Sequence, residues 1–272
     1  TKTRQPWFGC ACCPSNLCRF IPSVPGYLYG VKDNNIYVNL FAGNTSTIKV
    51  QGKDVVLEET TEYPWNGDIK IAVKKSGVKN ANLLVRIPGW VRNQVVPSDL
   101  YKYSDAEKPA YTVTVNGKAV EADLDANKGY LPVKNIKKGD VIRIHFDMPV
   151  RTVVANNKVA DDKGKVAVER GPLVYCAEAV DNSNEPVLRA VVAKKPTFTL
   201  VDNYSIQNTE TKGAPAFSVK AIKTDAQVLE EGANGISVKN DKLTLIPYYA
   251  WNHRGANEMN VWFIQNLSML DK

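Results

Sequence analysis

Short runs in which apolar and polar residues alternate dominate the chain from about residue 30 onward. Such runs have a period of two, which is typical of half-buried strands, and they are rich in Val, Ile, Thr and Tyr. The Asn-Gly pair at 116–117 and Lys-Gly-Asp at 138–140 predict tight turns between runs. The clear runs are NIYVNLF, STIKV, DIKIAV, NLLVRI, YTVTVNG, DVIRIHF, KVAVE, PLVYCAE, AFSVKAI, ISVKNDKLTLI and MNVWFIQ.

Many short strands at this spacing predict a mainly β protein of two antiparallel, jelly-roll-like β-sandwiches. A parallel sheet with crossover helices is disfavoured, because helical runs are missing between the strands. One set of strands ends near Met148 and Pro149, and a polar, loop-like stretch follows at 155–165. We therefore place the first sandwich at 30–150 and the second at 151–272, with room for a strand that crosses from one to the other.

The beginning of the chain follows a different pattern. In CCPSNLCRFI, Pro14 suits the first turn of a helix, and Pro22 and Pro25 favour its end, which predicts about two helical turns. A lone short helix has little to bury against beside a sandwich. We interpret 1–29 as the tail of a helical domain whose remainder lies upstream.

Composition excludes two broad classes of partner. The chain has 272 residues, of which 44% are hydrophobic and 23% charged, as in a globular protein with a sizeable core. Its net charge is +7, but the lysines are scattered along the chain and do not form a basic stripe. The densest groups of lysines lie at predicted turns. No stretch reaches the roughly 20 apolar residues that span a bilayer. We expect neither a nucleic-acid nor a membrane partner.

Four of the five cysteines lie within FGCACCPSNLCRF at 8–20. A disulfide is one interpretation, although a vicinal bridge between Cys12 and Cys13 is strained and an odd number leaves one thiol over. A zinc site is another, because thiolates are preferred zinc ligands. A second cysteine pair is missing, and His145 and His253 stand alone downstream, so this chain would supply only part of such a site.

A reactive thiolate is the third interpretation. If a helix opens near Pro14, Cys12 and Cys13 lie at its positive end, which favours a thiolate. A neighbouring metal ion deprotonates a thiol outright, and the resulting thiolate is a nucleophile as well as a ligand. The residues alone leave the three interpretations open.

At this segment the chain resembles a known family. CCPSNLCRFIPSVPGYLYGVKDNNIYVNLF is similar to the signature of the bacterial β-L-arabinofuranosidases of glycoside hydrolase family 127, once grouped as a domain of unknown function. Weaker matches follow in the expected order: LLVRIPGW at 83–90, GYLPV at 129–133, RGPLVYCAE at 170–178 and PYYAWNHRG at 247–255.

The resemblance implies an (α/α)6 barrel followed by two β-sandwiches, and retaining hydrolysis through a cysteine thiolate. On the family's Cys-Cys-Pro element, Cys12 matches the nucleophile, which is also a zinc ligand, and Cys13 matches a second zinc ligand. Cys10 matches a recurring cysteine, Cys18 receives no role, and Cys176 is expected in the core. The acid/base Glu and the remaining zinc ligands, a Glu and a Cys, belong to the barrel. We therefore expect the fragment alone to be inactive and to hold zinc weakly.

The loop PYYAWNHRG provides the candidate sugar contacts Trp251, His253 and Arg254, because aromatic and polar side chains share one turn. Trp90 and Trp262 lie in apolar runs and are expected to be buried. The alternative function is a non-catalytic carbohydrate-binding β-sandwich module, which leaves the cysteines without a role.

The expected partners are an arabinose-containing oligosaccharide or polysaccharide, the upstream barrel of the same chain, and a second copy in a homodimer formed through a β-sandwich. Family resemblance places such enzymes in the bacterial periplasm or cytoplasm. The exact sugar and linkage are not encoded in these residues.

Overall fold

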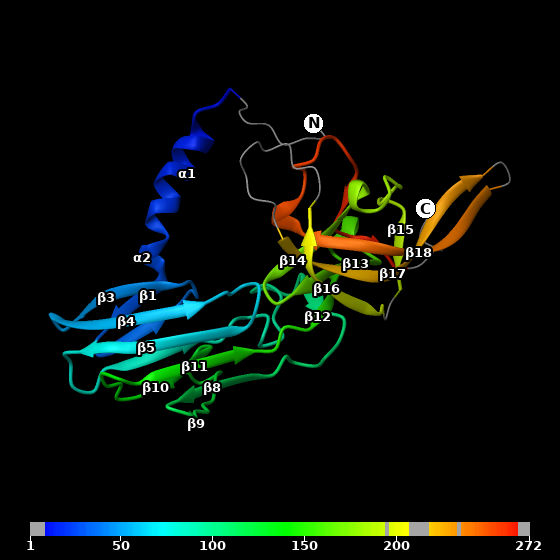
Figure 1. Ribbon diagram of the computed structural model, residues 1–272. Coiled ribbons are helices and arrows are strands. Elements are labelled where there is room, and N and C mark those ends of the chain that lie inside the picture. The colour runs from blue at the N-terminus through cyan, green and yellow to red at the C-terminus, as the bar shows by residue number, and fades with distance from the viewer. Residues whose placement is uncertain (1–8, 194–195, 207–217, 233–234, 266–272) are drawn as a thin grey trace. The chain divides into compact units, whose positions relative to one another are not determined.

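The computed structural model describes residues 9–193, 196–206, 218–232 and 235–265 (Figure 1). These residues form two compact units. The N-terminal unit comprises 9–93 and 107–148, and the C-terminal unit comprises 94–106 and 149–265. The described residues contain no helix long and apolar enough to cross a membrane. The structure is mainly β, as the alternating pattern predicts.

Within its described residues, the N-terminal unit contains two helices and two sheets. The helices are α1 (Cys12–Ser23) and α2 (Pro25–Leu28). The four-stranded sheet has the order β1 (Tyr29–Lys32), β2 (Asn35–Val38), β6 (Asn82–Arg86), β10 (Tyr130–Val133). The six-stranded sheet has the order β3 (Asn44–Val50), β4 (Lys53–Thr61), β5 (Asp68–Ser76), β11 (Val141–Phe146), β8 (Tyr111–Val115), β9 (Lys118–Ala119).

The alternation along these strands separates a buried face from an exposed one. In β11, for example, Ile142, Ile144 and Phe146 are buried while Arg143 and His145 are exposed. Phe146 packs against the aromatic rings of Phe41, Tyr63 and Trp90, with ring centroids 5.7, 6.3 and 5.8 Å away. Apolar burial on this face is the main stabilising contribution to the unit.

Both predicted tight turns are present. Asn116 and Gly117 have φ values of 50° and 83°, which suit the two central positions of a hairpin turn between β8 and β9. Gly139 has a φ of 95° just before β11. Only residues that tolerate positive φ fit here at low cost, so the turn chemistry in the sequence identified them correctly.

The C-terminal unit contains ten strands in its described residues, and they pair into a single ladder. Because β14 pairs with both β13 and β18, the strands from β14 through β18, β17, β15 and β20 to β13 form a closed ring of paired strands. The strands are β7 (Tyr101–Tyr103), β12 (Val150–Ala155), β13 (Lys165–Arg170), β14 (Leu173–Glu178), β15 (Ala190–Val192), β16 (Phe198–Ser205), β17 (Ser218–Gly232), β18 (Gly235–Pro247), β19 (Met259–Asn260) and β20 (Phe263–Ile264). Short 3-10 helices are η1 (Ala160–Asp162), η2 (Ala179–Asp181) and η3 (Tyr248–Ala250).

One detail of this unit agrees with the sequence pattern, which leaves room for a crossing strand, and another differs from it. The strand β7 comes from 94–106, a segment enclosed in sequence by the N-terminal unit, and it pairs with β12. The run MNVWFIQ forms two short strands, β19 and β20, instead of one. The Asn260 Oδ1 atom accepts a hydrogen bond from the Trp262 backbone N–H, and this local turn interrupts the strand.

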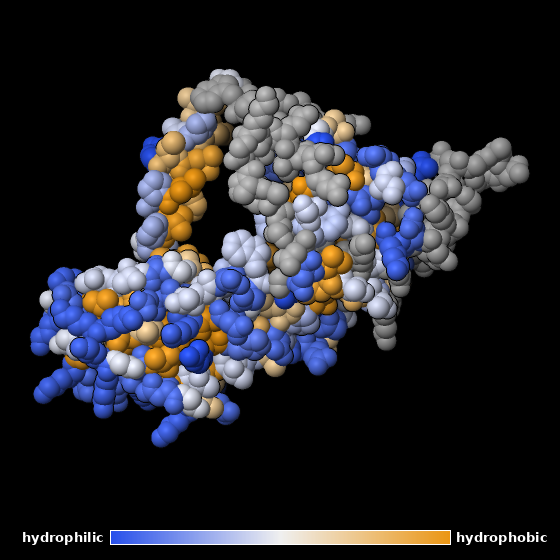
Figure 2. Space-filling view, in the orientation of Figure 1, coloured by the Kyte–Doolittle hydropathy of each residue, from blue (hydrophilic) through white to orange (hydrophobic). Residues whose placement is uncertain are grey.

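Helix α1 is longer than the two turns expected from its prolines. It continues to Ser23 and contains Pro22, because a proline in the last turn removes one hydrogen bond without ending the helix at once. Figure 2 shows an apolar stripe along α1. Its Leu17, Phe20 and Ile21 side chains are 56%, 56% and 62% exposed, and α1 buries none of its residues against the described part of the chain.

A buried polar cluster lies beneath the point where α2 passes into β1. The Glu59 carboxylate, 3% exposed, accepts hydrogen bonds from the Tyr29 hydroxyl at 3.1 Å and from the Ala42 backbone N–H at 3.0 Å. Asn44 also bonds to the Tyr29 hydroxyl. Burial raises the pKa of Glu59 to about 7, against the lowering influence of these hydrogen bonds.

Glu59 predicts a pH dependence of stability. The folded state binds the Glu59 proton more tightly than the unfolded state, whose pKa is near 4.5, so this stabilisation is complete below pH 4.5 and is lost as the pH rises through about 7. The change is worth about 3 kcal/mol in the free energy of unfolding. The Glu59→Gln variant should not show this change when its free energy of unfolding is measured with urea between pH 4.5 and pH 7. Glu58→Gln, on the exposed side of β4, should show the wild-type dependence; an identical dependence in Glu59→Gln contradicts the prediction.

Candidate active site

The cysteine cluster lies at the start of α1, as predicted. Cys12 and Cys13 are the first two residues of the helix, and Pro14 occupies its first turn, where the missing N–H costs no helical hydrogen bond. Ala11 precedes the helix and provides no side-chain cap. The free backbone N–H groups of this turn therefore point toward the segment that carries the thiols.

All five cysteines have free thiols, so the disulfide interpretation is wrong for this structure. The Sγ atoms of Cys10 and Cys12 are 3.1 Å apart, and those of Cys12 and Cys13 are 3.8 Å apart. These separations are well beyond the roughly 2.05 Å of an S–S bond. Cys10, Cys12, Cys13 and Cys18 are exposed, whereas Cys176 is buried.

Hydrogen bonding within the cluster sets the direction of two thiol pKa values. A hydrogen bond from the Cys12 backbone N–H, followed by one from the Cys12 thiol, lowers the pKa of Cys10. The pKa of Cys12 is raised, first by its hydrogen bond with Cys10 and then by that with Cys13. This direction is opposite to the thiolate expected for Cys12 at the helix end, because the hydrogen bonds to the two neighbouring sulfurs raise its pKa more than the backbone N–H groups of Cys12 and Cys13 lower it.

The donor set fits part of a zinc site. Two sulfurs that each lie about 2.3 Å from one tetrahedral zinc ion stand about 3.8 Å apart. The Cys12 and Cys13 sulfurs have this separation, 3.8 Å, and thiolates are preferred zinc ligands. Among the described residues, no group of three or more His, Cys, Asp or Glu side chains is arranged to hold a metal ion.

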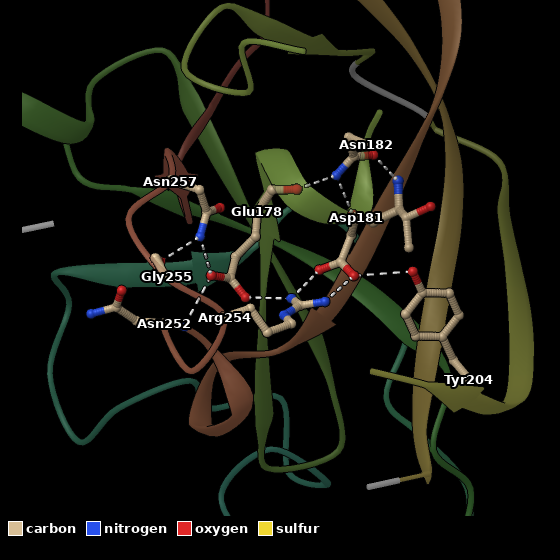
Figure 3. Close-up of polar contacts among 9 residues, drawn as sticks. Glu178, Asp181, Asn182, Tyr204, Asn252, Arg254, Gly255 and Asn257 are labelled. Carbon is tan, nitrogen blue, oxygen red and sulfur yellow. Dashed lines mark hydrogen bonds and ion pairs between the residues drawn. The ribbon is translucent and has the colours of Figure 1, made fainter. Parts of the chain in front are cut away.

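The second predicted site, the loop after β18, is organised around a buried arginine (Figure 3). Arg254 lies between Glu178, at 2.6 Å, and Asp181, at 2.5 Å, and these three side chains are 2%, 0% and 2% exposed. The Glu178 carboxylate also accepts hydrogen bonds from the Asn252 backbone N–H at 2.9 Å and from Asn257 Nδ2 at 3.1 Å. The network joins the loop to the end of β14.

Charge pairing dominates the electrostatics of this network. Burial by itself would lower the pKa of Arg254, but its hydrogen bonds to Asp181 and Glu178 overcome that influence and raise it. The Tyr204 hydroxyl donates to Asp181 Oδ1 at 3.0 Å. The arginine thus holds the loop in shape.

The predicted sugar contacts of this loop differ in their surroundings. The Trp251 ring stacks on the Tyr248 ring at 5.9 Å, and Tyr248 and Tyr249 are 43% and 45% exposed. His253 is exposed, whereas Arg254 is buried in its ion pairs. That Trp251, His253 and Arg254 contact a sugar stays a prediction.

The structure places the other cysteine, histidine and tryptophan residues named in the sequence analysis within or beside the strands and their core. Cys176 is fully buried beside Ile246, as predicted. Trp90 is 7% exposed, and its Nε1–H donates to the Tyr63 hydroxyl at 3.1 Å. His145 lies on β11 and has hydrogen-bonding partners. Trp262 is only half-buried.

Sequence reasoning missed the carboxylates of the loop network, Glu178 and Asp181. A signal for one of them was available, because Glu178 ends the buried part of the run PLVYCAE. A carboxylate at the end of an otherwise apolar strand is rarely buried without a cationic partner. Nothing in the sequence says that Arg254, more than 70 positions downstream, is that partner.

Comparison with known proteins decides the family. Residues 35–148 match the beta-L-arabinofuranosidase GH127 middle domain, and residues 150–264 match the glycoside hydrolase family 127 C-terminal domain. The chain belongs to glycoside hydrolase family 127.

Individual members of the family are similar to this chain over nearly its whole length. The non-reducing end beta-L-arabinofuranosidase of Bifidobacterium longum subsp. longum is 32% identical over 270 residues, which is 95% of this chain and 38% of that protein. A solved GH127 beta-arabinofuranosidase has a TM-score of 0.88 and 48% identity, and the match covers 98% of this chain and 40% of that one. The solved GH127 beta-L-arabinofuranosidase of Geobacillus stearothermophilus T6 has a TM-score of 0.79 and 30% identity. The match covers 98% of this chain and 39% of that one. This chain spans about two fifths of their length.

Proposed function

We propose that this chain is the C-terminal portion of a retaining β-L-arabinofuranosidase that acts on arabinose-containing glycans with Cys12 as its nucleophile. Family membership supports the substrate class, and the exposed thiols at the start of α1 support the nucleophile. In this proposal the two units are β-sandwiches that follow an (α/α)6 barrel. The uncovered apolar stripe of α1 is the surface that the barrel would cover.

The residues of this chain account for one half of the proposed reaction. The Cys12 thiolate attacks the anomeric carbon, a C–S bond forms, and the glycosidic C–O bond breaks. The leaving oxygen takes a proton from an acid/base group, which then activates water to displace the sulfur. In the proposal that group lies in the barrel, so the fragment alone is inactive.

Cys12 and Cys13 are the residues that would hold zinc. When bound, zinc would keep both thiols deprotonated at neutral pH. The remaining ligands are proposed to come from the barrel, since two thiolates alone bind zinc weakly.

The activity of the full-length protein tests this proposal. With zinc and reductant present, it should release the aryl group from an aryl β-L-arabinofuranoside much faster than from matched aryl glycosides of other sugars. An enzyme that ignores the arabinofuranoside but cleaves another member of the panel contradicts the substrate. Silence across the panel with a loaded metal site contradicts the catalytic function and favours the carbohydrate-binding alternative.

Zinc content tests the metal ligands separately. In the full-length protein, Cys13→Ser should lower the bound zinc from about one equivalent to well below half, because a hydroxyl is a far weaker zinc ligand than a thiolate. Atomic absorption after dialysis measures this directly. Cys18→Ser, on the same helix, should retain its zinc, and equal loss in both variants would refute the assignment.

Two exposed tyrosines and a half-buried tryptophan in the loop after β18 favour a second, accessory function. Tyr248, Tyr249 and Trp251 are grouped at one turn, and aromatic rings commonly stack on sugar rings. We place a glycan contact there, subordinate to the catalytic one. A homodimer through a β-sandwich stays a prediction.

A further inference from the structure

A hollow of about 380 Å³ on the exposed face of the six-stranded sheet is not used by the proposed reaction. The strand register places Lys70 of β5 directly opposite Arg143 of β11. Thr60 of β4 pairs with Lys70 on one side, and Thr114 of β8 pairs with Arg143 on the other. All four residues line the hollow. Two cationic side chains flanked by two hydroxyls thus form one row across four neighbouring strands.

The two cations of this row lack an acidic partner among the residues that the structure describes. Three lysines of the same sheet do have one: Lys49 and Lys75 pair with Asp54, and Lys74 pairs with Glu58 at 2.9 Å. Like charges placed directly opposite each other on neighbouring strands destabilise a sheet. An anion that contacts both Lys70 and Arg143 would remove this repulsion.

The neighbouring row supplies groups that suit sugar hydroxyls. There Asp68 pairs with His145, and His145 pairs with Thr112. His145 Nδ1 is 2.7 Å from Asp68 Oδ1, and its Nε2 is 3.1 Å from Asp147 Oδ1. The imidazole holds the Asp68 carboxylate in place while the second carboxylate oxygen stays available to accept a hydrogen bond.

We propose that this hollow binds an acidic saccharide, with the carboxylate of a uronate unit on Lys70 and Arg143 and its hydroxyls on Thr60, Thr114 and Asp68. The guanidinium offers paired N–H donors that match a carboxylate, and the lysine adds a point charge. The volume lies within the range of small-ligand sites. Among the described residues, no Phe, Tyr or Trp lines the hollow, so the recognition proposed here comes from charge and not from stacking on a large aromatic ring. The inference rests on the proposed function, because the acidic unit would belong to the same arabinose-containing glycan.

Calorimetric titration of the full-length protein tests the proposal. Trigalacturonate should bind, and its affinity should fall as salt screens the exposed charges. The fully methyl-esterified trisaccharide keeps the hydroxyls but lacks the charge, and it should bind at least about tenfold more weakly. Lys70→Gln combined with Arg143→Gln should weaken trigalacturonate binding by at least about tenfold as well, and Arg143→Lys by less.

Matched variants and ligands separate this from a general charge effect. Lys49→Gln combined with Lys74→Gln removes two charges from the same sheet outside the hollow and should bind like the wild type. The proposal is overturned if the ester binds equally, if both double variants bind equally, or if the wild type does not bind. Equal binding of inorganic phosphate would show an anion site without a saccharide. Because binding is measured without hydrolysis, its failure leaves the proposed function standing, and an inactive protein that binds leaves this inference standing.

Discussion

Cys12→Ser should abolish hydrolysis by the full-length protein, lowering kcat/KM on an aryl β-L-arabinofuranoside by at least about a thousandfold. A serine hydroxyl stays protonated near neutral pH and is a much weaker nucleophile than a thiolate. The measurement is the steady-state rate of aryl release by the variant and the wild type, with equal protein and zinc concentrations. A wild-type adduct of one sugar on Cys12, trapped and located by mass spectrometry, would separate the nucleophilic role from metal binding.

Cys18→Ser provides the matched control for this experiment. Cys18 lies on the same exposed helix and has no assigned role, so its replacement should change kcat/KM by less than about twofold. The prediction fails if Cys12→Ser retains activity. It fails equally if Cys18→Ser loses as much, because the loss would then reflect damage to α1 and not to a nucleophile.

Arg254→Met should lower the free energy of unfolding of the C-terminal unit by about 3 to 5 kcal/mol. Methionine has a similar length but leaves Glu178 and Asp181, 0% and 2% exposed, without a cationic partner. Two buried carboxylates without a cation are costly, because the neutral donors that remain, Asn252, Asn257 and Tyr204, do not offset their negative charge. Urea unfolding would measure the loss of stability of the whole protein. Hydrogen exchange of the folded protein would show whether that loss lies in the C-terminal unit.

An exposed ion pair provides the comparison for Arg254. Lys74→Met removes one partner of the pair with Glu58, whose side chains are 50% and 39% exposed, and should cost less than about 1 kcal/mol. Adding Glu178→Gln and Asp181→Asn to Arg254→Met should restore part of the lost stability, because the buried charges are then gone. A loss in Arg254→Met no larger than in Lys74→Met would contradict the assigned role of the network.

Local patterns anticipated much of the fold because they depend on neighbouring residues. The alternation in DVIRIHF predicts β11 with its buried and exposed faces, and Asn116-Gly117 predicts the turn between β8 and β9. The run MNVWFIQ predicts one strand, but a side-chain hydrogen bond of Asn260 interrupts it, and hydropathy does not register such a bond. The prolines predict a helix shorter than α1, because a proline in the last turn removes one hydrogen bond without ending the helix at once.

Contiguous residues are enough to predict the β class, the position of the helix at the cysteine cluster and the family resemblance. Which distant side chains meet depends on how the whole chain folds. The fold places Arg254 between Glu178 and Asp181, and it sets Lys70 opposite Arg143. Strand order and register bring these partners together, and they result from the packing of the whole chain, which a linear pattern does not encode.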